Sequence, residues 1–342
     1  MNFTKNTKIR TAAVTALLII SIFAQGLTAA AAEKTLVPMG SAVGIQIYTK
    51  GVLVVGLSAT GGGTEPSPGA VAGLVPGDLI TALGGDKITN GEDFRAAAAK
   101  LTAEPVSLRV QRGDESLQMT VTPKMTAGVA ELGIWLRDNV SGIGTLTYYD
   151  PETGSYGGLG HGINDVDSGV LMPLGKGSIL NASITEIKKG CAGVPGELCG
   201  SYDLKNLRGS ILKNTPSGIF GKLEAGLPQA EAAIPLAKSS EIELGKATIL
   251  ANLQGSAAEE YEVEIARVYR GDEAGRSMLI CVKDARLLER AGGIVQGMSG
   301  SPIIQNGKLI GAVTHVFIND PTRGYGISIE NMLNAAENAK AG

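Results

Sequence analysis

Ser299 lies in the stretch of this chain whose residue types most clearly suggest chemistry, the hexapeptide Gly-Met-Ser-Gly-Ser-Pro at 297–302. A serine hydroxyl is a weak nucleophile at neutral pH, so it needs a base for its proton and hydrogen-bond donors for the oxyanion that forms. Gly297 allows a bend that can direct the N–H groups of Gly297 and Ser299 into one space, and Gly300 leaves room beside the hydroxyl. A glycine-rich turn before the apolar pair Ile303–Ile304 would have the same composition, so the motif needs support from elsewhere in the chain.

The chain has only two histidines, His161 and His315. His161 follows an expected β-hairpin with its turn at 150–154 and is flanked by glycines in Gly-Leu-Gly-His-Gly-Ile at 158–163. A Ser-His-Asp protease of the chymotrypsin order has its histidine before its serine, so His161 is the candidate general base for Ser299. The alternative is a structural histidine at the end of a strand.

The third member of such a triad is an aspartate between the two, and spacing alone does not choose it. Asp284 directly follows the apolar run 278–282, and the end of a strand is a rigid place from which to hold an imidazole. The alternative is an aspartate that caps the strand next to a solvated Lys283 and Arg286. Asp165 and Asp167 are further candidates, although they lie close to His161 in sequence.

The apolar run Lys308–His315 follows the serine as the strand that lines the substrate channel follows it in trypsin-like enzymes. We therefore expect Thr314 and His315 beside a bound peptide, with Tyr325 in another wall of the pocket. The alternative for His315 is a histidine at the end of a core strand. It is a poor candidate for the base, because it comes after the serine.

Length and composition indicate a two-domain protein built largely from short strands. The chain has 342 residues, 48 glycines, 4% aromatic residues and a net charge of −3. The near balance of charge gives no indication of nucleic-acid binding, and abundant glycine favours tight turns over long helices.

Residues 1–32 have the pattern of an export signal. Lys5, Lys8 and Arg10 precede an uncharged stretch with an apolar centre, and alanines at 29–32 offer cleavage sites. The rest of the chain is therefore expected outside the cytoplasm. The stretch is also just long enough to span a bilayer, so removal and retention as an anchor both remain open.

The three cysteines give no pattern of a metal site. Cys191 and Cys199 bracket a short loop and could pair in an oxidising compartment, whereas Cys281 lies in an apolar strand and is expected to be a buried core residue. A zinc site would need a fourth ligand and a paired spacing that the chain does not offer. We expect neither a metal nor a cofactor.

Residues 36–124 resemble a PDZ domain. The segment 67–88 is similar to the short helix, the Gly-Asp-x-Ile strand and the following turn of bacterial PDZ domains, and a helical pattern at 92–101 and an antiparallel pair, 106–110 with 117–121, follow. PDZ domains bind peptides by adding a strand to an exposed edge. The candidate edge is Val43–Tyr48; alternatively, the domain acts only in internal packing or regulation.

Residues 128–342 show many short strand patterns separated by turns. This favours a mostly β fold, a chymotrypsin-like double β-barrel after the PDZ domain, with the active site in the cleft between the barrels. His161 would come from the first barrel and Ser299 from the second.

The PDZ segment, Gly-His-Gly-Ile and the run 293–308 together resemble the stage IV sporulation protein B peptidase family, and the similarity covers nearly all of the chain after its leader. The resemblance implies a serine endopeptidase with the triad His161, Asp284 and Ser299. It further implies export into the space between forespore and mother-cell membranes, cleavage of itself, and cleavage of a regulator of a membrane-embedded protease complex that controls a late sigma factor. The alternative is a PDZ-based regulatory or scaffold protein with an inactive protease-like domain.

Overall fold

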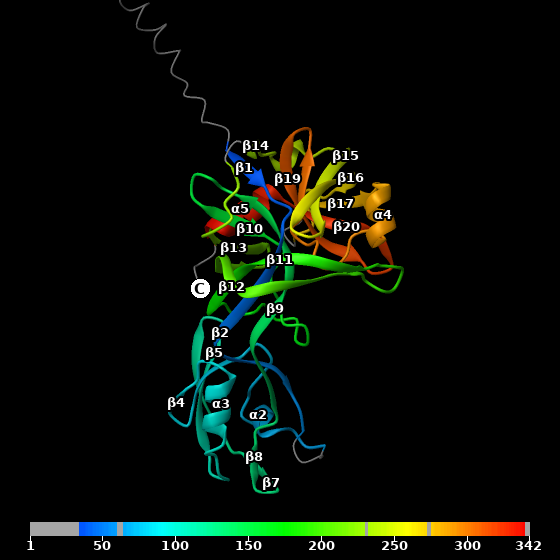
Figure 1. Cartoon of the computed structure of the whole chain (residues 1–342). Coiled ribbons are helices and arrows are strands. Elements are labelled where there is room, and N and C mark those ends of the chain that lie inside the picture. The colour runs from blue at the N-terminus through cyan, green and yellow to red at the C-terminus, as the bar shows by residue number, and fades with distance from the viewer. Residues whose placement is uncertain (1–33, 60–63, 230–231, 272–274, 339–342) are drawn as a thin grey trace, which may run out of the picture. The chain divides into compact units, whose positions relative to one another are not determined.

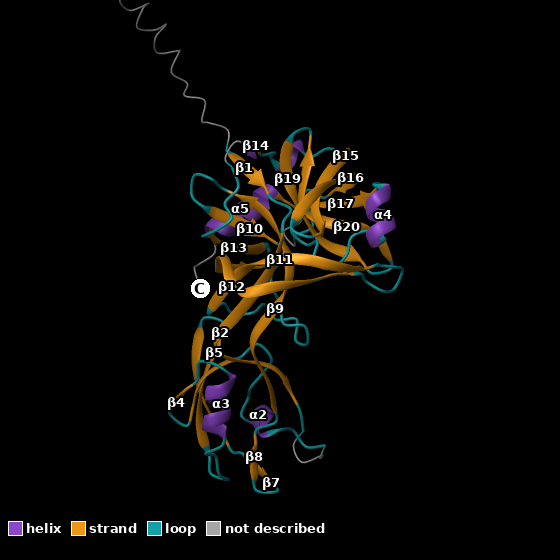
Figure 2. Cartoon of the chain, viewed as in Figure 1, coloured by secondary structure: helices purple, strands orange, loops and turns teal. Residues whose placement is uncertain are grey.

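The computed structural model describes residues 34–59, 64–229, 232–271 and 275–338, and these are mostly β-strands with a few short helices (Figure 2). The described residues from Thr35 onward form one compact unit. In the described ranges no helix is both long and apolar enough to cross a membrane. The expected export signal at 1–32 lies outside the described residues.

A first antiparallel barrel is closed by six strands, because the ladder that starts at β9 returns to β9 through β10, β13, β12, β11 and β2. Its core is an apolar cluster that includes Ile45, Leu146, Tyr156 and Ile179. Two short strands, β1 (Thr35–Pro38) and β14 (Ile234–Pro235), extend the sheet. The six barrel strands are β2 (Ala42–Leu57), β9 (Ile134–Tyr149), β10 (Ser155–Gly158), β11 (Lys176–Lys188), β12 (Glu197–Thr215) and β13 (Gly218–Leu223).

A second closed barrel follows in the order β15-β16-β17-β20-β19-β18. Every second residue along its strands points into the barrel, and inward apolar residues such as Ile249, Val263 and Ile280 form a separate buried cluster. The expected mostly β fold with a double barrel is therefore confirmed. The elements are β15 (Gly245–Gln254), β16 (Ala257–Val268), β17 (Met278–Val282), β18 (Pro302–Gln305), β19 (Lys308–Phe317) and β20 (Asp320–Ser328), with the 3-10 turn η2 (Ser239–Glu241) and helices α4 (Ala285–Ala291) and α5 (Ile329–Asn338).

The PDZ region lies between two neighbouring strands of the first barrel, as Figure 1 shows at β2 and β9. Both strands continue out of the barrel, and Leu57 of β2 still pairs with Ile134 of β9. The elements between them are α2 (Pro68–Val71), β3 (Leu79–Leu83), β4 (Asp86–Lys87), α3 (Gly91–Ala98), β5 (Val106–Arg112), β6 (Glu115–Val121), β7 (Lys124–Thr126) and β8 (Val129–Glu131).

The Gly-Asp-x-Ile motif has a clear structural purpose. The fully buried side chain of Asp78 accepts from the Val75 N–H at 3.0 Å and from two nitrogens of Arg112 at 2.7 and 2.8 Å. Arg112 also donates to the Gly73 carbonyl. The aspartate thus fixes the turn before β3 and ties it to the end of β5. The helix expected at 92–101 is α3, which Asn90 caps through the N–H groups of Glu92 and Asp93.

The expected peptide-binding edge, Val43–Tyr48, requires a correction. This part of β2 pairs with Asn181–Lys176 of β11 on one side and with Gly144–Asn139 of β9 on the other. Both sets of backbone groups are therefore used inside the barrel, and no ligand strand can be added there. The segment Leu36–Tyr48, which the sequence pattern places in the PDZ domain, belongs to the first barrel and to its extension β1.

Candidate active site

Ser299 lies in a tight loop of the second barrel, between α4 and β18. Gly297 and Gly300 have φ angles of +95° and +98°, a region that favours glycine. A Cβ at Gly300 would collide with the carbonyl oxygen of Thr145, so the first barrel approaches the loop too closely for any other residue. The side chain of Met298 points into the core and is fully buried.

Two threonines of β9 hold this loop from the first barrel. The N–H of Thr145 donates to the Ser299 carbonyl at 3.1 Å, and its hydroxyl donates to the Gly297 carbonyl at 2.7 Å. The hydroxyl of Thr147 donates to the Gly300 carbonyl at 2.8 Å. Sequence reasoning missed these residues. The available signal was the alternation Thr-Leu-Thr, which sends both hydroxyls to one face of a strand.

The β11–β12 hairpin supports the loop from another side. The Gln296 N–H donates to the Gly196 carbonyl and the Leu198 N–H donates to the Gln296 carbonyl, each at 2.9 Å. A Cβ at Gly297 would lie 3.1 Å from the Leu198 side chain. The backbone around Gly297 is therefore restrained on both sides. The backbone N–H groups of Gly297 and Ser299 have no hydrogen-bond partner in the described part of the chain, which leaves both available to a ligand.

His161 lies three positions after the end of β10 and is half-buried in the first barrel. Its Nδ1 lies 2.8 Å from the carbonyl oxygen of Gly162. A carbonyl only accepts, so Nδ1 carries the proton and Nε2 is left as the basic nitrogen. Burial lowers the pKa of His161, and the Gly162 carbonyl opposes this in part. The imidazole is thus neutral at neutral pH, as a general base must be.

Ser299 and His161 line the same cavity, which has a volume of about 270 Å³. The Ser299 hydroxyl does not bond to His161 in this structure; it donates to the carbonyl oxygen of Thr314 at 2.7 Å. The predicted nucleophile and base are therefore brought together, with the hydroxyl turned toward β19. The cavity wall is otherwise mainly backbone and apolar side chains, from Ile45, Val140, Ser141, Gly142, Ile143, Leu159, Gly162, Ile163, Asn164, Gln296 and Gly297.

Asp284 is not brought to His161. Its carboxylate caps α4 by accepting from the N–H groups of Arg286 and Leu287, and it also pairs with the Arg286 guanidinium. Arg286, together with backbone donors, lowers the pKa of Asp284 to about 2, despite partial burial that opposes the shift. In the described part of the chain, no hydrogen bond or ion pair joins this carboxylate to His161. The sequence offered an aspartate that caps the preceding strand as the alternative, whereas the structure shows Asp284 capping the N-terminus of α4.

The three residues predicted to line the substrate channel lie together on β19 and β20. The ring of His315 lies beside that of His161 with centroids 5.0 Å apart. Thr314 donates through its hydroxyl to the Tyr325 carbonyl at 3.2 Å. The ring of Tyr325 packs edge-on against Phe317. The side chain of His315 is exposed at the surface, yet desolvation by the protein around its ring, with smaller contributions from His161 and Arg276, lowers its pKa to about 4.

The alternative acids near His161 have other partners. The buried carboxylate of Asp165 accepts from Ser168 and contacts the guanidinium of Arg137, which also contacts Asp167. Burial alone would raise the pKa of Asp165, but the Ser168 hydrogen bonds and the charge of Arg137 outweigh it and lower the pKa. These contacts tie the loop after His161 to β9.

Cys191, Cys199 and Cys281 are all free thiols, so the possible pairing of the first two is not observed. In the described ranges no group of three or more histidine, cysteine or acidic side chains could hold a metal ion.

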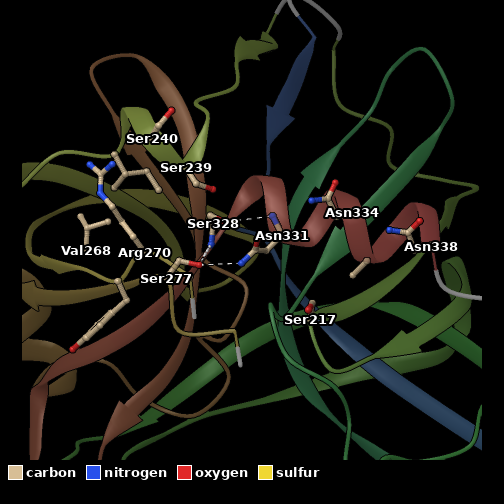
Figure 3. Close-up of a pocket in the computed structure, with 14 residues that line it drawn as sticks. Ser217, Ser239, Ser240, Val268, Arg270, Ser277, Ser328, Asn331, Asn334 and Asn338 are labelled. Carbon is tan, nitrogen blue, oxygen red and sulfur yellow. Dashed lines mark hydrogen bonds between the residues drawn. The ribbon is translucent and has the colours of Figure 1, made fainter. Parts of the chain in front are cut away.

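A larger cavity, of about 540 Å³, lies beside α5 (Figure 3). It shares no lining residue with the Ser299 cavity. Serine and asparagine side chains line much of it. The Ser277 hydroxyl there accepts from the Ser328 N–H at 2.9 Å and from the Asn331 side chain at 3.4 Å. No histidine is among the residues that line this cavity, and its lining residue Ser239 donates to the carboxylate of Glu330 at 2.7 Å.

Comparison with known sequences decides the family. Residues 128–333 match the family described as SpoIVB peptidase S55, and residues 63–112 match a PDZ domain. The chain belongs to the SpoIVB peptidase S55 family. The resemblance seen in the sequence motifs is therefore confirmed.

Curated relatives of this S55 family member match over short segments only. The chain is 42% identical over 60 residues to mitochondrial serine protease HTRA2 of Bos taurus, covering 18% of this chain and 13% of the relative. It is 32% identical over 81 residues to the putative zinc metalloprotease Atu1380 of Agrobacterium fabrum, covering 24% and 22%. The chain thus spans less than a quarter of the length of either relative.

Solved structures similar to the S55 chain include the active form of the Rv3671c protease of M. tuberculosis and the HtrA-type protease AlgW with a tripeptide. The first has a TM-score of 0.33 and 16% identity, covering 59% of this chain and 76% of that one. The second has a TM-score of 0.36 and 16% identity, covering 58% and 55%.

Proposed function

We propose that this S55 family member is a serine endopeptidase in which Ser299 is the nucleophile and His161 the general base. The observation that supports this most directly is the shared cavity. It contains a serine from one barrel, a neutral histidine from the other, and a loop with two unpaired backbone N–H groups. These are the three parts that acyl transfer requires.

In the proposed reaction, rotation of the Ser299 side chain moves its hydroxyl from the Thr314 carbonyl toward Nε2 of His161. The oxygen attacks the scissile carbonyl carbon while Nε2 takes the proton, and the N–H groups of Gly297 and Ser299 stabilise the oxyanion. Collapse breaks the C–N bond, and the imidazolium returns the proton to the leaving amine. Water then hydrolyses the acyl-enzyme with His161 again as the base.

The orienting partner of His161 in this proposal is the Gly162 carbonyl, which already accepts from Nδ1. The resemblance assigns this role to Asp284, and that assignment remains a prediction. For Asp284 to fulfil it, the carboxylate would have to leave the end of α4.

The test is modification by a fluorophosphonate probe, followed by mass spectrometry of the protein's own fragments. We expect the probe on Ser299, and we expect Ser299→Ala to lose both the label and any self-cleavage while it unfolds at the same temperature. Self-cleavage at an unchanged rate in purified Ser299→Ala would contradict the proposal.

Membership in the S55 family supports a more specific proposal. The enzyme would act during endospore formation, after export into the space between the two membranes, on itself and on a regulator of a membrane-embedded protease complex. Self-cleavage in the test above, together with cleavage of a purified regulator of that complex, would support this role.

A second candidate function is a PDZ-based regulatory or scaffold protein with an inactive protease-like domain. The hydrogen bond from Ser299 to Thr314, rather than to His161, favours it. The probe separates the two functions, because a protein that never orients Ser299 toward a base would stay unlabelled under all conditions, including in the presence of peptide.

A further inference from the structure

The strand β9 leaves one edge without a partner over most of its length. Along one side it pairs with β2 from Thr145 to Ile134. On the other side β10 pairs with it only from Tyr149 to Leu146. No ladder covers this second side from 134 to 144 in the described residues. We call this the open β9 edge. An unpaired edge of this length is unusual, since its N–H and C=O groups are ready to pair with another chain.

The backbone groups that face outward can be assigned from the hydrogen bonds at the end of the edge. The N–H of Thr145 donates to Ser299 and its C=O accepts from Leu159, so both groups of Thr145 point away from β2. Orientation alternates along a strand, so every second residue before Thr145 also points outward. The Asp138 carbonyl, which accepts from Thr49 of β2, has the opposite orientation, as this alternation requires. The outward residues are Ile143, Ser141, Asn139, Arg137 and Trp135.

The open β9 edge begins in the catalytic cavity. Val140 to Ile143 form one wall of the space that Ser299 and His161 share. Ser141 and Gly142 are exposed and small, so a chain can approach their backbone. The other end of the edge lies in the part of β9 that pairs with Leu53–Leu57, where Trp135 is 63% exposed. One continuous strand edge therefore connects the reacting groups with the PDZ region.

We propose that the open β9 edge binds the segment of the substrate polypeptide that follows the cut bond, as an added antiparallel strand. This inference rests on the proposed function and specifies which part of the substrate the site holds. Direction supports it: β9 runs toward Ser299, so an antiparallel strand runs away from it, with its first residues at the catalytic centre.

The lining of the cavity favours particular substrate side chains just after the cut bond. Its wall beside the edge is formed by Ile45, Ile143, Leu159 and Ile163, all apolar and each buried or partly buried. An apolar side chain within the first two positions after the cut fits this wall. The nine residues from Ile143 to Trp135 span about 27 Å at roughly 3.4 Å per residue, so the edge has room for about nine residues of substrate.

The experiment uses the Ser299→Ala protein and a ten-residue peptide with apolar residues at its first two positions. Trp135 is the only tryptophan in the chain, so its fluorescence reports binding at the far end of the edge. Two matched peptides each carry N-methyl groups on three alternate amides, one on the odd-numbered and the other on the even-numbered positions; we call these the two methylation phases. We expect the parent peptide and one methylated peptide to bind with similar affinity. We expect the other methylated peptide to bind at least about tenfold more weakly, because only one set of amides faces β9.

A protein variant provides an independent measurement. Ser141→Pro removes one outward N–H, whereas Ser141→Ala keeps it and removes only the hydroxyl. We expect at least about tenfold weaker peptide binding for the proline variant and a change within about twofold for the alanine variant. If the proline variant has lost thermal stability, Asn139→Pro replaces it, since the Asn139 N–H also faces outward.

The outcomes separate this inference from the proposed function. Equal binding of both methylated phases, or no binding, overturns the role of the open β9 edge, whereas probe labelling of Ser299 in the unmodified protein would still support the enzyme. Phase-dependent binding without labelling under any condition would support the edge and count against the enzyme. A dimer in sedimentation that peptide cannot dissociate would show that a second copy occupies the edge, which also overturns the inference.

Discussion

The rings of His161 and His315 lie with centroids 5.0 Å apart and tilted by 38°, one from each barrel. Two imidazoles at this distance disfavour protonation of each other, and burial lowers the pKa of both. Two neutral histidines therefore lie together at neutral pH, one lining the cavity of Ser299 and one on the predicted substrate wall.

We predict that both histidines titrate below the ordinary value of 6.5, with His315 near 4. Since these are the only two histidines, their ring signals in an NMR titration can be assigned with His161→Gln and His315→Gln. The unfolded chain binds protons at a higher pH than the folded one, so these groups lower stability as pH falls from about 7 toward 4. A His315 signal that titrates at or above 6.5 would contradict the prediction.

We predict that Gly297→Ala disables the oxyanion site. The alanine would have to adopt φ +95° and would press on Leu198 at 3.1 Å, at a cost of about 1–3 kcal/mol. Displacement of even one oxyanion donor lowers kcat by about 100-fold or more. The matched control is Gly307→Ala, which has a φ of +74° but open space around its Cβ. Equal probe labelling rates for the two variants would count against a role for Gly297.

Two substitutions of Asp284 distinguish helix capping from catalysis. We expect Asp284→Asn to retain activity within about tenfold, because asparagine also caps helices well, and Asp284→Ala to lose about 1 kcal/mol of stability. If Asp284 instead orients His161, the asparagine variant loses activity by about 10⁴-fold with little change in stability. Probe labelling and thermal unfolding of both variants give the answer.

We predict that Asp78→Ala destabilises the PDZ region by about 2 kcal/mol, because it leaves the Val75 N–H and Arg112 without their buried partner. Hydrogen exchange of the β3 amides measures this locally. The control, Asp86→Ala, removes an exposed pair with Lys100 and should change protection little. Equal effects of the two substitutions would show that burial of Asp78 contributes nothing.

Much of the site was predictable because local patterns encode it. The glycines around Ser299 and the hairpin before His161 fix local conformations, and the structure has both where the sequence placed them. What the sequence could not give was pairing between distant strands. The segment Val43–Tyr48 has the pattern of an exposed edge, but β11, more than 120 positions later in the chain, covers it.

The observed partners of Asp284 were not predictable for a related reason. An aspartate at the end of a strand can face a histidine or begin a helix, and the residues that follow Asp284 form α4. The help that Thr145 and Thr147 give to the serine loop depends on contacts across more than 150 positions, which no local pattern reports.

The position of the PDZ region between β2 and β9 has a consequence for how the gene can be shortened. A deletion from the N-terminus through the PDZ region would also remove β1 and β2, so the first barrel would lose a wall. An internal excision that joins Tyr48 to Asn139 through a short turn would instead reconnect two residues that are already paired. The PDZ region is thus an elaborated hairpin loop of the peptidase, and it could have been gained or lost in evolution without any rearrangement of the barrels.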